Sequence, residues 1–452
     1  MKRYVPLLFL TLLTIIFDGC KKDPEPIEIT GHQQYGEPFS NVPVTEDIVM
    51  YEVNLRAFSQ DGNLAGVQQK LDHLASLGVN VIWLMPIQTN GGPLNSPYCI
   101  SNFYEVDVEY GTLADLRAFV DEAHNRDMAV ILDWVANHTS WDHSWIDSVG
   151  WHTTDAQGNI IHPSGTNWTD VADLNFDHLD LQHQMIDAMR YWVLEANVDG
   201  YRCDAADYVP FDFWQKAIDS LRSIPNREII MLAEGARTDH FDAGFDMNFD
   251  WNFYTKGKDI FVQGTPAIQW ATLHQYTYGS VVEGKHKLRF TSNHDECAWH
   301  DTPIGLYGGL DASIAAFAAT LFYPGVPLLY TGQEIGYPTQ LPFFSNLPIN
   351  WNYGQSSLTR YQELIQVYQA HDVCRNGEFS DYSSTDAVCF KRYNNQKSLW
   401  CLVNTKNNSY HINVPNELQG VHLVEELTGQ QIGFSNTLEP VSYTHLTLPT
   451  KA

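Results

Sequence analysis

Three acidic residues, Asp204, Glu234 and Asp295, each follow a short apolar run and could act together on one substrate. Glu234 comes 30 residues after Asp204, and Asp295 comes 61 residues after Glu234. These intervals match one and two strand–helix units of about 30 residues each. Because the carboxyl ends of parallel strands share one edge of a sheet or one rim of a barrel, we expect the three carboxylates to converge.

The residues around Asp204 and Glu234 predict different protonation states for these two carboxyl groups. Arg202 lies two positions before Asp204 in GYRCDAAD, and alternate residues of a strand point to the same side. A guanidinium at close range lowers a carboxyl pKa by about 1 to 3 units, so we expect Asp204 to be an anion. Glu234 follows the apolar run IIMLA, where partial desolvation raises a carboxyl pKa and favours the protonated form.

One ionised and one protonated carboxyl group, about 5 to 5.5 Å apart, is the pair that retaining glycoside hydrolysis requires. In that chemistry Asp204 would be the nucleophile and Glu234 the general acid and then the base. Asp295 could accept hydrogen bonds from sugar hydroxyls. Further polar residues at the predicted strand ends are Asp133, Asn137, His138 and His294. The simpler alternatives are a structural ion pair for the Arg–Asp pair and core histidines for the two His residues.

The elements that must position these residues follow an alternating pattern from residue 47 onward. Val-, Ile- and Leu-rich runs predict eight strands, at 48–58, 79–87, 128–134, 198–204, 228–235, 243–249, 288–295 and 326–334. Helical patterns fall at 64–77, 113–123, 181–195 and 357–371. Eight such units favour an α/β fold of the (β/α)₈ TIM-barrel type over an open doubly wound sheet. No dinucleotide-binding glycine fingerprint supports the open sheet.

Beyond the barrel, which we assign to residues 45–372, the pattern changes to alternating strands. These strands predict a small antiparallel β domain at 373–440. Cys389 and Cys401 lie in adjacent predicted strands and could form a disulfide bond. Residues 441–452 do not continue the strand pattern, and we interpret them as a non-native tail.

The N-terminus is typical of a targeting segment. Two basic residues precede an apolar run that is too short to span a membrane, so residues 1–20 are predicted to be a signal peptide. The run ends at Cys20, as in bacterial lipoprotein signals, where the cysteine is lipidated; simple secretion is the alternative. The polar, Pro-rich segment 21–44 is expected to be a linker. We therefore expect a secreted protein, lipid-anchored to the bacterial outer membrane or cell surface.

The charge of the chain limits the choice of partners. The 452 residues include 54 Asp and Glu but only 26 Lys and Arg, and 44% are apolar. An acidic excess of this size repels nucleic acid and anionic membrane surfaces, which favours a neutral or cationic partner. The only membrane contact we expect is the N-terminal lipid anchor.

Four segments resemble, in order and spacing, the main motifs of the α-amylase family of glycoside hydrolases. They are DWVANH (133–138), GYRCDAAD (200–207), LAEG (232–235) and SNHD (292–295). SPYCISNFYEVDVEYGT and GVPLLYTGQE resemble two further landmarks of the family, so the resemblance extends over about residues 45–435. It implies a (β/α)₈ barrel with a short inserted domain after the third strand, here at 139–180, and a C-terminal antiparallel β domain.

The resemblance also implies a role for each residue of the site. Asp204 would be the nucleophile, Glu234 the acid/base and Asp295 the transition-state stabiliser. The residues that would bind the sugar at the cleavage point are Arg202, His138, His294 and, stacked beneath it, Tyr98.

A structural calcium ion is implied by three further positions. Asn137 and Asp173 match calcium-binding positions of the family, and oxygen donors suit this ion. Tyr208 stands where many members have a His whose backbone carbonyl is a ligand. No organic cofactor is implied. Asp173 lies in VADLN, which matches neither the usual endo-amylase form nor the usual 1,6-glucosidase form, so the linkage preference stays open.

The implied partner is an α-glucan polysaccharide or oligosaccharide, cleaved at α-1,4 bonds as in starch or maltooligosaccharides. Cyclodextrin- or pullulan-cleaving enzymes, α-1,6-glucosidases and glucosyl transferases would use the same residues, because water and sugar acceptors compete for one glycosyl-enzyme intermediate. An alternative of another class is a non-catalytic glycan-binding lipoprotein, although the three carboxylates argue against it. The sequence also leaves open whether four tryptophans stack on sugars or form the core of the inserted domain: Trp141, Trp145, Trp151 and Trp168.

Overall fold

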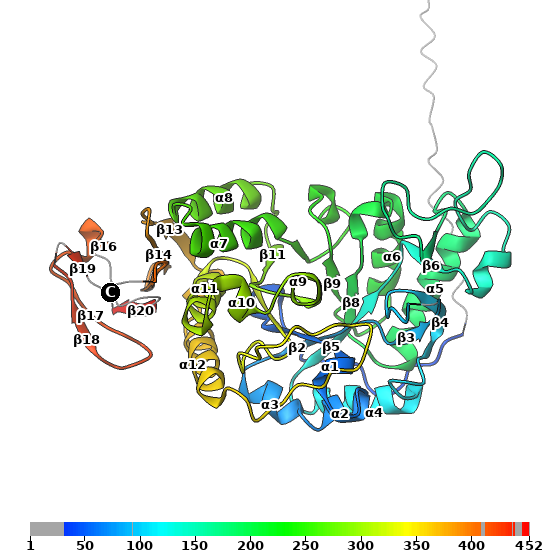
Figure 1. The fold of residues 1–452 in the computed structure, drawn as a ribbon, viewed down its shortest axis with the longest axis horizontal. Helices are drawn as coiled ribbons and strands as arrows, with labels where there is room; N and C mark the ends of the chain where they lie inside the picture. The colour runs from blue at the N-terminus through cyan, green and yellow to red at the C-terminus, as the bar shows by residue number, and fades with distance from the viewer. Residues whose placement is uncertain (1–30, 93, 408–411, 436, 439–444, 452) are drawn as a thin grey trace, which may run out of the picture.

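The barrel is present in the computed structural model, which describes residues 31–92, 94–407, 412–435, 437–438 and 445–451 (Figure 1). Within these residues, eight parallel strands close in the order β1-β12-β11-β10-β9-β8-β5-β2. They are β1 (Met50–Val53), β2 (Val81–Leu84), β5 (Ala129–Trp134), β8 (Gly200–Cys203), β9 (Ile230–Ala233), β10 (Met247–Phe249), β11 (His286–Arg289) and β12 (Val326–Tyr330). The predicted α/β fold class and TIM-barrel architecture are confirmed.

Alternate residues of these strands pack into two separate apolar clusters. Met50 and Trp83 belong to one cluster, whereas their strand neighbours Tyr51 and Leu84 belong to the other. The second cluster also contains helix residues such as Trp192, so it lies between the barrel and its helices. Because successive side chains of a strand point to opposite faces, the first cluster fills the barrel interior.

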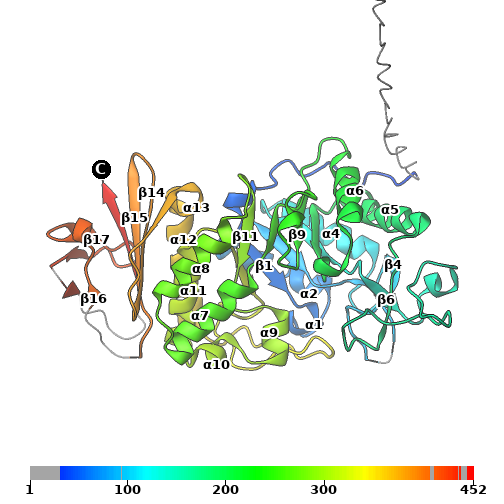
Figure 2. The same ribbon diagram turned by 90° about the horizontal axis from the view of Figure 1, so that it is seen from above.

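Helices surround the barrel in both ribbon views (Figures 1 and 2). The predicted helix 64–77 is divided in two, because Lys70 leaves the helical conformation with φ −112° and ψ 9°. The α-helices are α1 (Leu55–Phe58), α2 (Leu64–Gln68), α3 (Leu71–Ser76), α4 (Leu113–His124), α5 (Leu179–Glu195), α6 (Phe211–Arg222), α7 (Trp251–Gln263), α8 (Ile268–Tyr278), α9 (His294–Trp299), α10 (Pro303–Tyr307), α11 (Leu310–Phe322), α12 (Gln355–Ala370) and α13 (Val373–Asn376). Short 3₁₀ helices are η1 (Thr45–Asp47), η2 (Ser144–Asp147), η3 (Ala206–Tyr208), η4 (Thr238–His240) and η5 (Asn416–Leu418).

The long segment after β5 forms a small unit beside the carboxyl end of the barrel. In it, β6 (His138–Ser140) pairs antiparallel with β7 (Val171–Asp173). A second antiparallel pair, β3 (Gln88–Asn90) and β4 (Ile100–Val106), follows β2. Both pairs stand at the end of the barrel that carries the predicted catalytic residues.

A C-terminal sheet of antiparallel strands follows the barrel, and its order is β13-β14-β15-β20. The strands of this region are β13 (Glu378–Asp381), β14 (Ala387–Tyr393), β15 (Lys397–Asn404), β16 (Ile412–Asn413), β17 (His422–Val424), β18 (Gln431–Gly433), β19 (Thr437–Leu438) and β20 (His445–Lys451). The expectation that residues 441–452 would not continue the strand pattern is therefore wrong for β20, whose backbone pairs with β15. The non-native origin of this tail and the domain boundaries remain predictions.

The proposed disulfide bond between Cys389 and Cys401 is absent, since both are free in the described part of the chain. Cys389 lies opposite Leu402 in the β14–β15 pair, and Cys401 lies opposite Phe390. The two thiols therefore point to opposite faces of the sheet and belong to different apolar clusters. Adjacent strands brought the two backbones together but not the two sulfur atoms.

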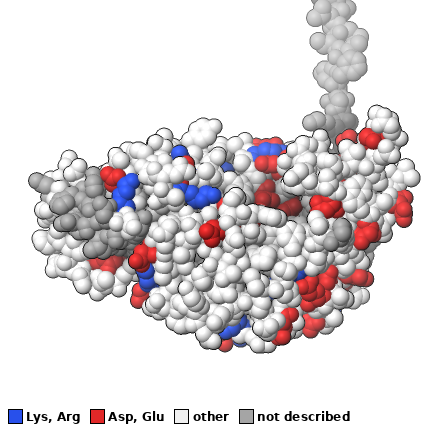
Figure 3. Space-filling model, viewed as in Figure 1, with Lys and Arg blue, Asp and Glu red and all other residues white. Residues whose placement is uncertain are grey.

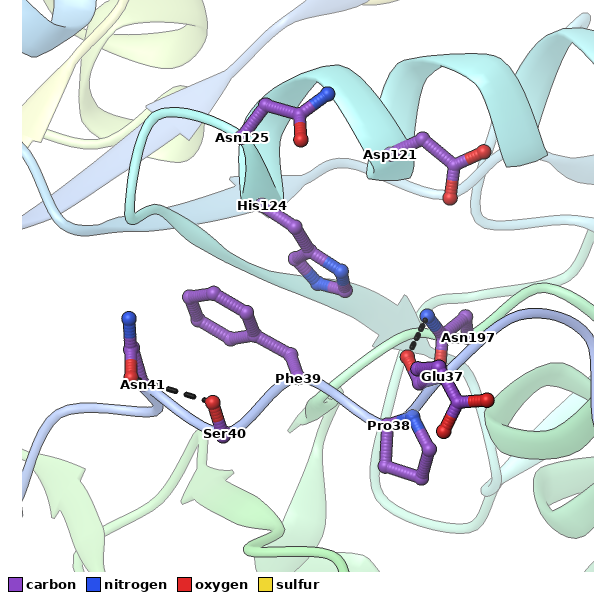
Figure 4. Close-up of a pocket in the computed structure, with 9 residues that line it drawn as sticks. All are labelled: Glu37, Pro38, Phe39, Ser40, Asn41, Asp121, His124, Asn125 and Asn197. Atoms are coloured by element: carbon purple, nitrogen blue, oxygen red, sulfur yellow. Dashed lines mark hydrogen bonds between the residues drawn. The ribbon is translucent and has the colours of Figure 1, made fainter.

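The described part of the expected linker packs against the barrel rather than extending from it. Tyr35 donates its backbone N–H to the Leu194 carbonyl at 2.8 Å and its hydroxyl to Asp121 at 2.7 Å. Phe39 stacks on His124 with ring centroids 4.2 Å apart (Figure 4). This contact borders an open polar hollow of about 490 Å³ whose lining shares no residue with the predicted site.

Among the described residues, no helix combines the length and apolar character needed to cross a bilayer. The predicted signal peptide and lipidated Cys20 lie outside the described residues. On the face drawn in Figure 3, acidic side chains are widely spread and basic side chains are sparse, in line with the acidic composition.

Gly200, the first residue of β8, lies too close to β9 to carry a side chain. Its φ is +152°, and a Cβ atom there would lie 1.9 Å from the carbonyl oxygen of Ile230. A methyl group at this position would push apart the two strands that lead to Asp204 and Glu234. Gly309 has a similar φ of +142°, but a Cβ there would meet nothing within 4 Å.

We therefore expect Gly200→Ala to lower the free energy of unfolding by at least about 2 kcal/mol more than Gly309→Ala, because only the first substitution adds a clash to the backbone strain. Urea denaturation of both variants measures the difference. Equal losses would mean that the contact between β8 and β9 does not require glycine.

Candidate active site

A single guanidinium group joins three carboxylates at the carboxyl end of the barrel. Arg202 Nη1 lies 2.8 Å from Asp133 Oδ1 and 2.9 Å from Asp204 Oδ1, and its Nη2 lies 2.9 Å from Glu234 Oε2. The arginine side chain is 1% exposed. The expectation that Asp204 and Glu234 share one cleft is met by this geometry, since adjacent nitrogens of one planar group hold them both.

Strand register explains how these residues meet. Asp133 on β5 is the direct neighbour of Arg202 on β8, and Arg202 is in turn the neighbour of Leu232 on β9. Asp204 and Glu234 each follow their strand by one residue. Aromatic rings surround the cation, with centroids 4.9 Å away at Trp83, 5.7 Å at Phe249 and 5.8 Å at Tyr98. Burial of the charge is thus offset by ion pairs and ring faces together.

The expected lowering of the Asp204 pKa is wrong. Burial raises the pKa of Asp204 to about 6; Arg202 opposes the shift, while Asp133 and Asp295 add to it. One guanidinium shared by three carboxylates cannot offset the free-energy cost of desolvating each of them. Burial likewise raises the pKa of Glu234 to about 7. Arg202 opposes this shift, and the charges of Asp204 and Asp295 add to it. The expected order of the two pKa values is still found, since Glu234 is the weaker acid.

Hydrogen bonds orient both of these carboxyl groups. Glu234 Oε2 accepts from the backbone N–H of Ala205 at 2.8 Å as well as from Arg202. Its second oxygen is therefore the natural position for a proton. In Asp204, Oδ1 is the atom held by Arg202, so attack on a substrate falls to Oδ2.

Asp295 and His294 begin helix α9 at the same rim. His294 Nε2 lies 3.5 Å from Asp295 Oδ2 and 2.9 Å from the Tyr98 hydroxyl. Tyr98 stacks on the His294 ring with centroids 5.2 Å apart and an interplanar angle of 18°. Burial lowers the pKa of His294, but Asp295 and Glu52 more than offset it and raise the pKa to about 9. Glu52 on β1 was not among the predicted residues.

His138 contacts the backbone of Tyr98. Its Nε2 is 3.1 Å from the Tyr98 backbone carbonyl, which identifies this nitrogen as the hydrogen-bond donor. Burial lowers the pKa of His138 to about 4, so the ring is neutral near pH 7. The two predicted sugar-binding histidines therefore carry different charges.

These residues surround a cleft of about 770 Å³. Tyr98, His138, Asp204, Glu234, His294 and Asp295 all line it. Arg202 is not in the lining and lies beneath the carboxylates, so it acts through them rather than by touching a ligand. Predicted site residues from five separate segments thus meet at one concave surface, as a binding site requires.

The cleft has an aromatic wall that the sequence analysis did not predict. Trp299, 61% exposed, contacts Phe343 edge-on at 5.9 Å and Phe344 at 5.6 Å. Further apolar lining residues are Leu94, Trp251 and Trp168. The available signal was aromatic residues in the segments that follow β11 and β12, because the segments after the strands at this end of a barrel form the binding surface.

The four tryptophans of the inserted segment divide between the two proposed roles. Trp145 is buried and packs edge-on against Trp151 at 5.2 Å, so these two form core. Trp168 lines the cleft and contacts His138 at 5.8 Å. Trp141 is 41% exposed and outside the cleft lining.

The predicted calcium positions fit only part of a coordination shell. Asn137 directly precedes His138, which pairs with Asp173 across β6 and β7, so these two lie close together. The ring of Tyr208 contacts Trp168 at 5.5 Å. Calcium takes roughly six to eight oxygen ligands, and the described residues contain no group of three or more His, Cys, Asp and Glu that could hold a metal. Calcium remains a prediction.

Known proteins were compared with this barrel and cleft. The sequence model of the family described as "Alpha amylase, catalytic domain" matches residues 33–419. The chain belongs to the α-amylase family of glycoside hydrolases. A crystal structure of an alpha-amylase from Lactobacillus plantarum is similar with a TM-score of 0.81 and 26% identity, covering 90% of this chain and 99% of that chain.

Two curated relatives carry the alpha-amylase name. Alpha-amylase MalA of Haloarcula japonica is 30% identical over 312 residues, which are 66% of this chain and 46% of that protein. Alpha-amylase 3 of Dictyoglomus thermophilum is 26% identical over 402 residues, 79% of this chain and 77% of that protein. The match spans about half the length of the first relative and about three quarters of the second.

The raised pKa of Asp204 predicts a pH-dependent cost to stability. The pKa is about 6 in the folded protein against an ordinary value of 3.8. The ionised form is therefore disfavoured by folding, with no cost below about pH 4, a growing cost up to about pH 6 and a constant cost above. Asp204→Asn should raise the free energy of unfolding at pH 7 by on the order of 1 kcal/mol.

Urea denaturation of the wild type and of Asp204→Asn at pH 7 and pH 4 checks this sign. The variant should be the more stable at pH 7, and the two should agree at pH 4. A variant that is less stable at pH 7 would show that the ion pair with Arg202 outweighs the burial of Asp204.

Proposed function

We propose that this protein is a retaining glycoside hydrolase that cleaves α-1,4-glucosidic bonds in starch or maltooligosaccharides. The single observation that carries the proposal is the guanidinium of Arg202, which holds Asp204 and Glu234 side by side at the edge of the cleft. Their pKa values of about 6 and about 7 allow one carboxylate and one carboxylic acid near neutral pH. Membership of the α-amylase family and the names of the relatives support the substrate class.

In the first step, Asp204 Oδ2 attacks the anomeric carbon while the bond from that carbon to the leaving oxygen breaks. Glu234 transfers its proton to this oxygen, so the shortened glucan leaves neutral and the sugar is esterified to Asp204. In the second step, the Glu234 carboxylate takes a proton from water, whose oxygen attacks the anomeric carbon and releases Asp204. Both carboxyl groups return to their starting protonation states.

The other cleft residues supply binding and charge. Asp295 is the carboxylate that accepts from sugar hydroxyls as the ring flattens, and Tyr98 supplies a flat face beneath it. Neutral His138 and cationic His294 both line the cleft, where they would contact the sugar. The same residues would serve glucosyl transfer, because the choice between water and a sugar acceptor comes after the covalent step.

Two further features complete the proposal. The structural calcium ion would use Asn137, Asp173 and the carbonyl of Tyr208, and a melting temperature that chelator leaves unchanged would count against it. Secretion with a lipid anchor at Cys20 would place the enzyme at the cell exterior, where α-glucans are available. Mass spectrometry of the mature N-terminus tests that anchor.

Asp204→Asn and Glu234→Gln should each lower kcat on soluble starch by at least about 10³-fold, since each removes a group that forms or breaks bonds. The wild type should release the α-anomer first, as NMR of fresh products measures, because two displacements retain configuration. Glu334→Gln, which alters a buried carboxyl outside the cleft lining, is the matched control. Substantial turnover by Asp204→Asn, or β-anomer as first product, would remove Asp204 from the nucleophile role.

The aromatic wall predicts a preference for longer glucans. Stacking on an exposed indole contributes about 0.5 to 1.5 kcal/mol, so Trp299→Ala should raise KM for amylose roughly 2- to 10-fold with kcat little changed. Trp141→Ala is the matched control, since Trp141 is exposed but not in the cleft lining. Equal KM values for the wild type and both variants would exclude the wall from substrate binding.

A further inference from the structure

A buried carboxylate that the proposed chemistry does not use lies directly behind the cleft. Glu52 is on β1 and is 0% exposed, between apolar neighbours that are equally buried. Its Oε1 is paired with His294 Nδ1 at 2.5 Å. Its Oε2 has no hydrogen-bond partner among the described residues. A carboxylate in such a place costs stability unless a charged partner compensates it, and the partner in contact is His294.

The hydrogen bonds of Tyr98 settle the state of the other His294 nitrogen. The Tyr98 hydroxyl lies 3.0 Å from Asp133 Oδ2 and 2.9 Å from His294 Nε2. Asp133 is a carboxylate held by Arg202, so it accepts and Tyr98 must give it the only hydroxyl proton. The contact with His294 then needs an N–H on Nε2.

Nδ1 of His294 must also carry a proton, because the carboxylate of Glu52 can only accept a hydrogen bond. With a proton on each nitrogen, His294 is an imidazolium. Its ring is fixed in position by Tyr98 on one face and by the edge-on contacts with Trp83 at 5.9 Å and Phe343 at 5.6 Å.

We propose that Glu52 is a positioning residue: its buried carboxylate accepts from Nδ1–H of His294 and so keeps the ring cationic, with Nε2–H directed at the Tyr98 hydroxyl on the side of Asp295. The inference rests on the proposed function for its catalytic meaning, but the protonation of His294 is a separate property that can be measured without substrate. Glu52 touches neither the cleft nor the reacting atoms.

The charged and titratable groups around His294 are consistent with this assignment. Burial and Arg202 act against the cation, and Asp295 and Glu52 act for it, with a resulting pKa of about 9. The groups that face or act on His294 come from β1, β5, β8, α9 and the loop before β4, and they are Glu52, Asp133, Arg202, Asp295 and Tyr98. Loss of the Glu52 charge would leave Asp295, itself partly exposed, as the main support of the cation.

The test is an NMR titration of the full-length protein with isotopically labelled histidine, in which the His294 signal is assigned by its loss in His294→Gln. In the wild type, both ring nitrogens of His294 should be protonated at pH 7. In Glu52→Gln the amide keeps a hydrogen-bond acceptor but loses the charge, so the midpoint should fall by about 1 to 3 pH units.

Glu334→Gln is the matched control for this titration. Glu334 is also 0% exposed and holds a different histidine, His73, at 2.8 Å. The Glu334→Gln substitution should leave the midpoint of the His294 titration unchanged. The alkaline limb of the pH profile of kcat/KM should move to lower pH in Glu52→Gln and not in Glu334→Gln, which a merely structural role would not produce.

A neutral His294 in the wild type at pH 7, or an unchanged midpoint in Glu52→Gln, would overturn the proposal. The wild-type measurement stands even where the variant fails to fold. An inactive wild type with a cationic His294 would count against the proposed function alone, whereas an active wild type with a neutral His294 would count against this inference alone.

Discussion

The shared guanidinium of Arg202 is the interaction on which the rest of the site depends. A planar group with two terminal nitrogens places Asp133, Asp204 and Glu234 at distances set by its own covalent geometry. A lysine at this position would be a point charge without that fork and could not hold the same three oxygens. The separation of the two reacting carboxyl groups is therefore a property of one side chain.

This arrangement has an electrostatic consequence that a simple ion pair does not have. Three buried carboxylates share one cation, so the pKa values of Asp204 and Glu234 rise although each touches an arginine. Both groups then titrate close to neutral pH, and the state with one proton between them is the one that catalysis needs. The pair titrates as a unit, because ionisation of either carboxyl raises the pKa of the other.

Much of this could be predicted from sequence, since it depended on order along the chain. The eight strands, the rim position of the carboxylates and the α-amylase resemblance all follow from periodicity and motif spacing. The pKa of Asp204 could not be predicted, because Asp133 shares Nη1 of Arg202 from 69 residues away. Glu52 was missed for the same reason, since its partner is 242 residues distant. The only local signal was a lone acid in an otherwise apolar strand.

Sequence reasoning failed elsewhere where it stopped at neighbouring backbones. Cys389 and Cys401 lie on adjacent strands, but strand register sends their side chains to opposite faces. Trp145 and Trp168 are the same residue type in the same inserted segment, yet Trp145 packs in the core and Trp168 lines the cleft. In each case the face of the element decides the role, and that face depends on contacts between segments far apart in the chain.

The hydrogen-bonded groups form one chain from β1 to β9, which runs Glu52, His294, Tyr98, Asp133, Arg202, Glu234. In such a chain each donor proton is committed to a single acceptor, so the protonation of one member limits that of the next. A proton on each His294 nitrogen lets Tyr98 give its hydroxyl proton to Asp133, which in turn keeps Asp133 an acceptor for Arg202. The cation at one end and the acid at the other are therefore set by one network, although Glu52 and its partner His294 are 242 residues apart in the sequence.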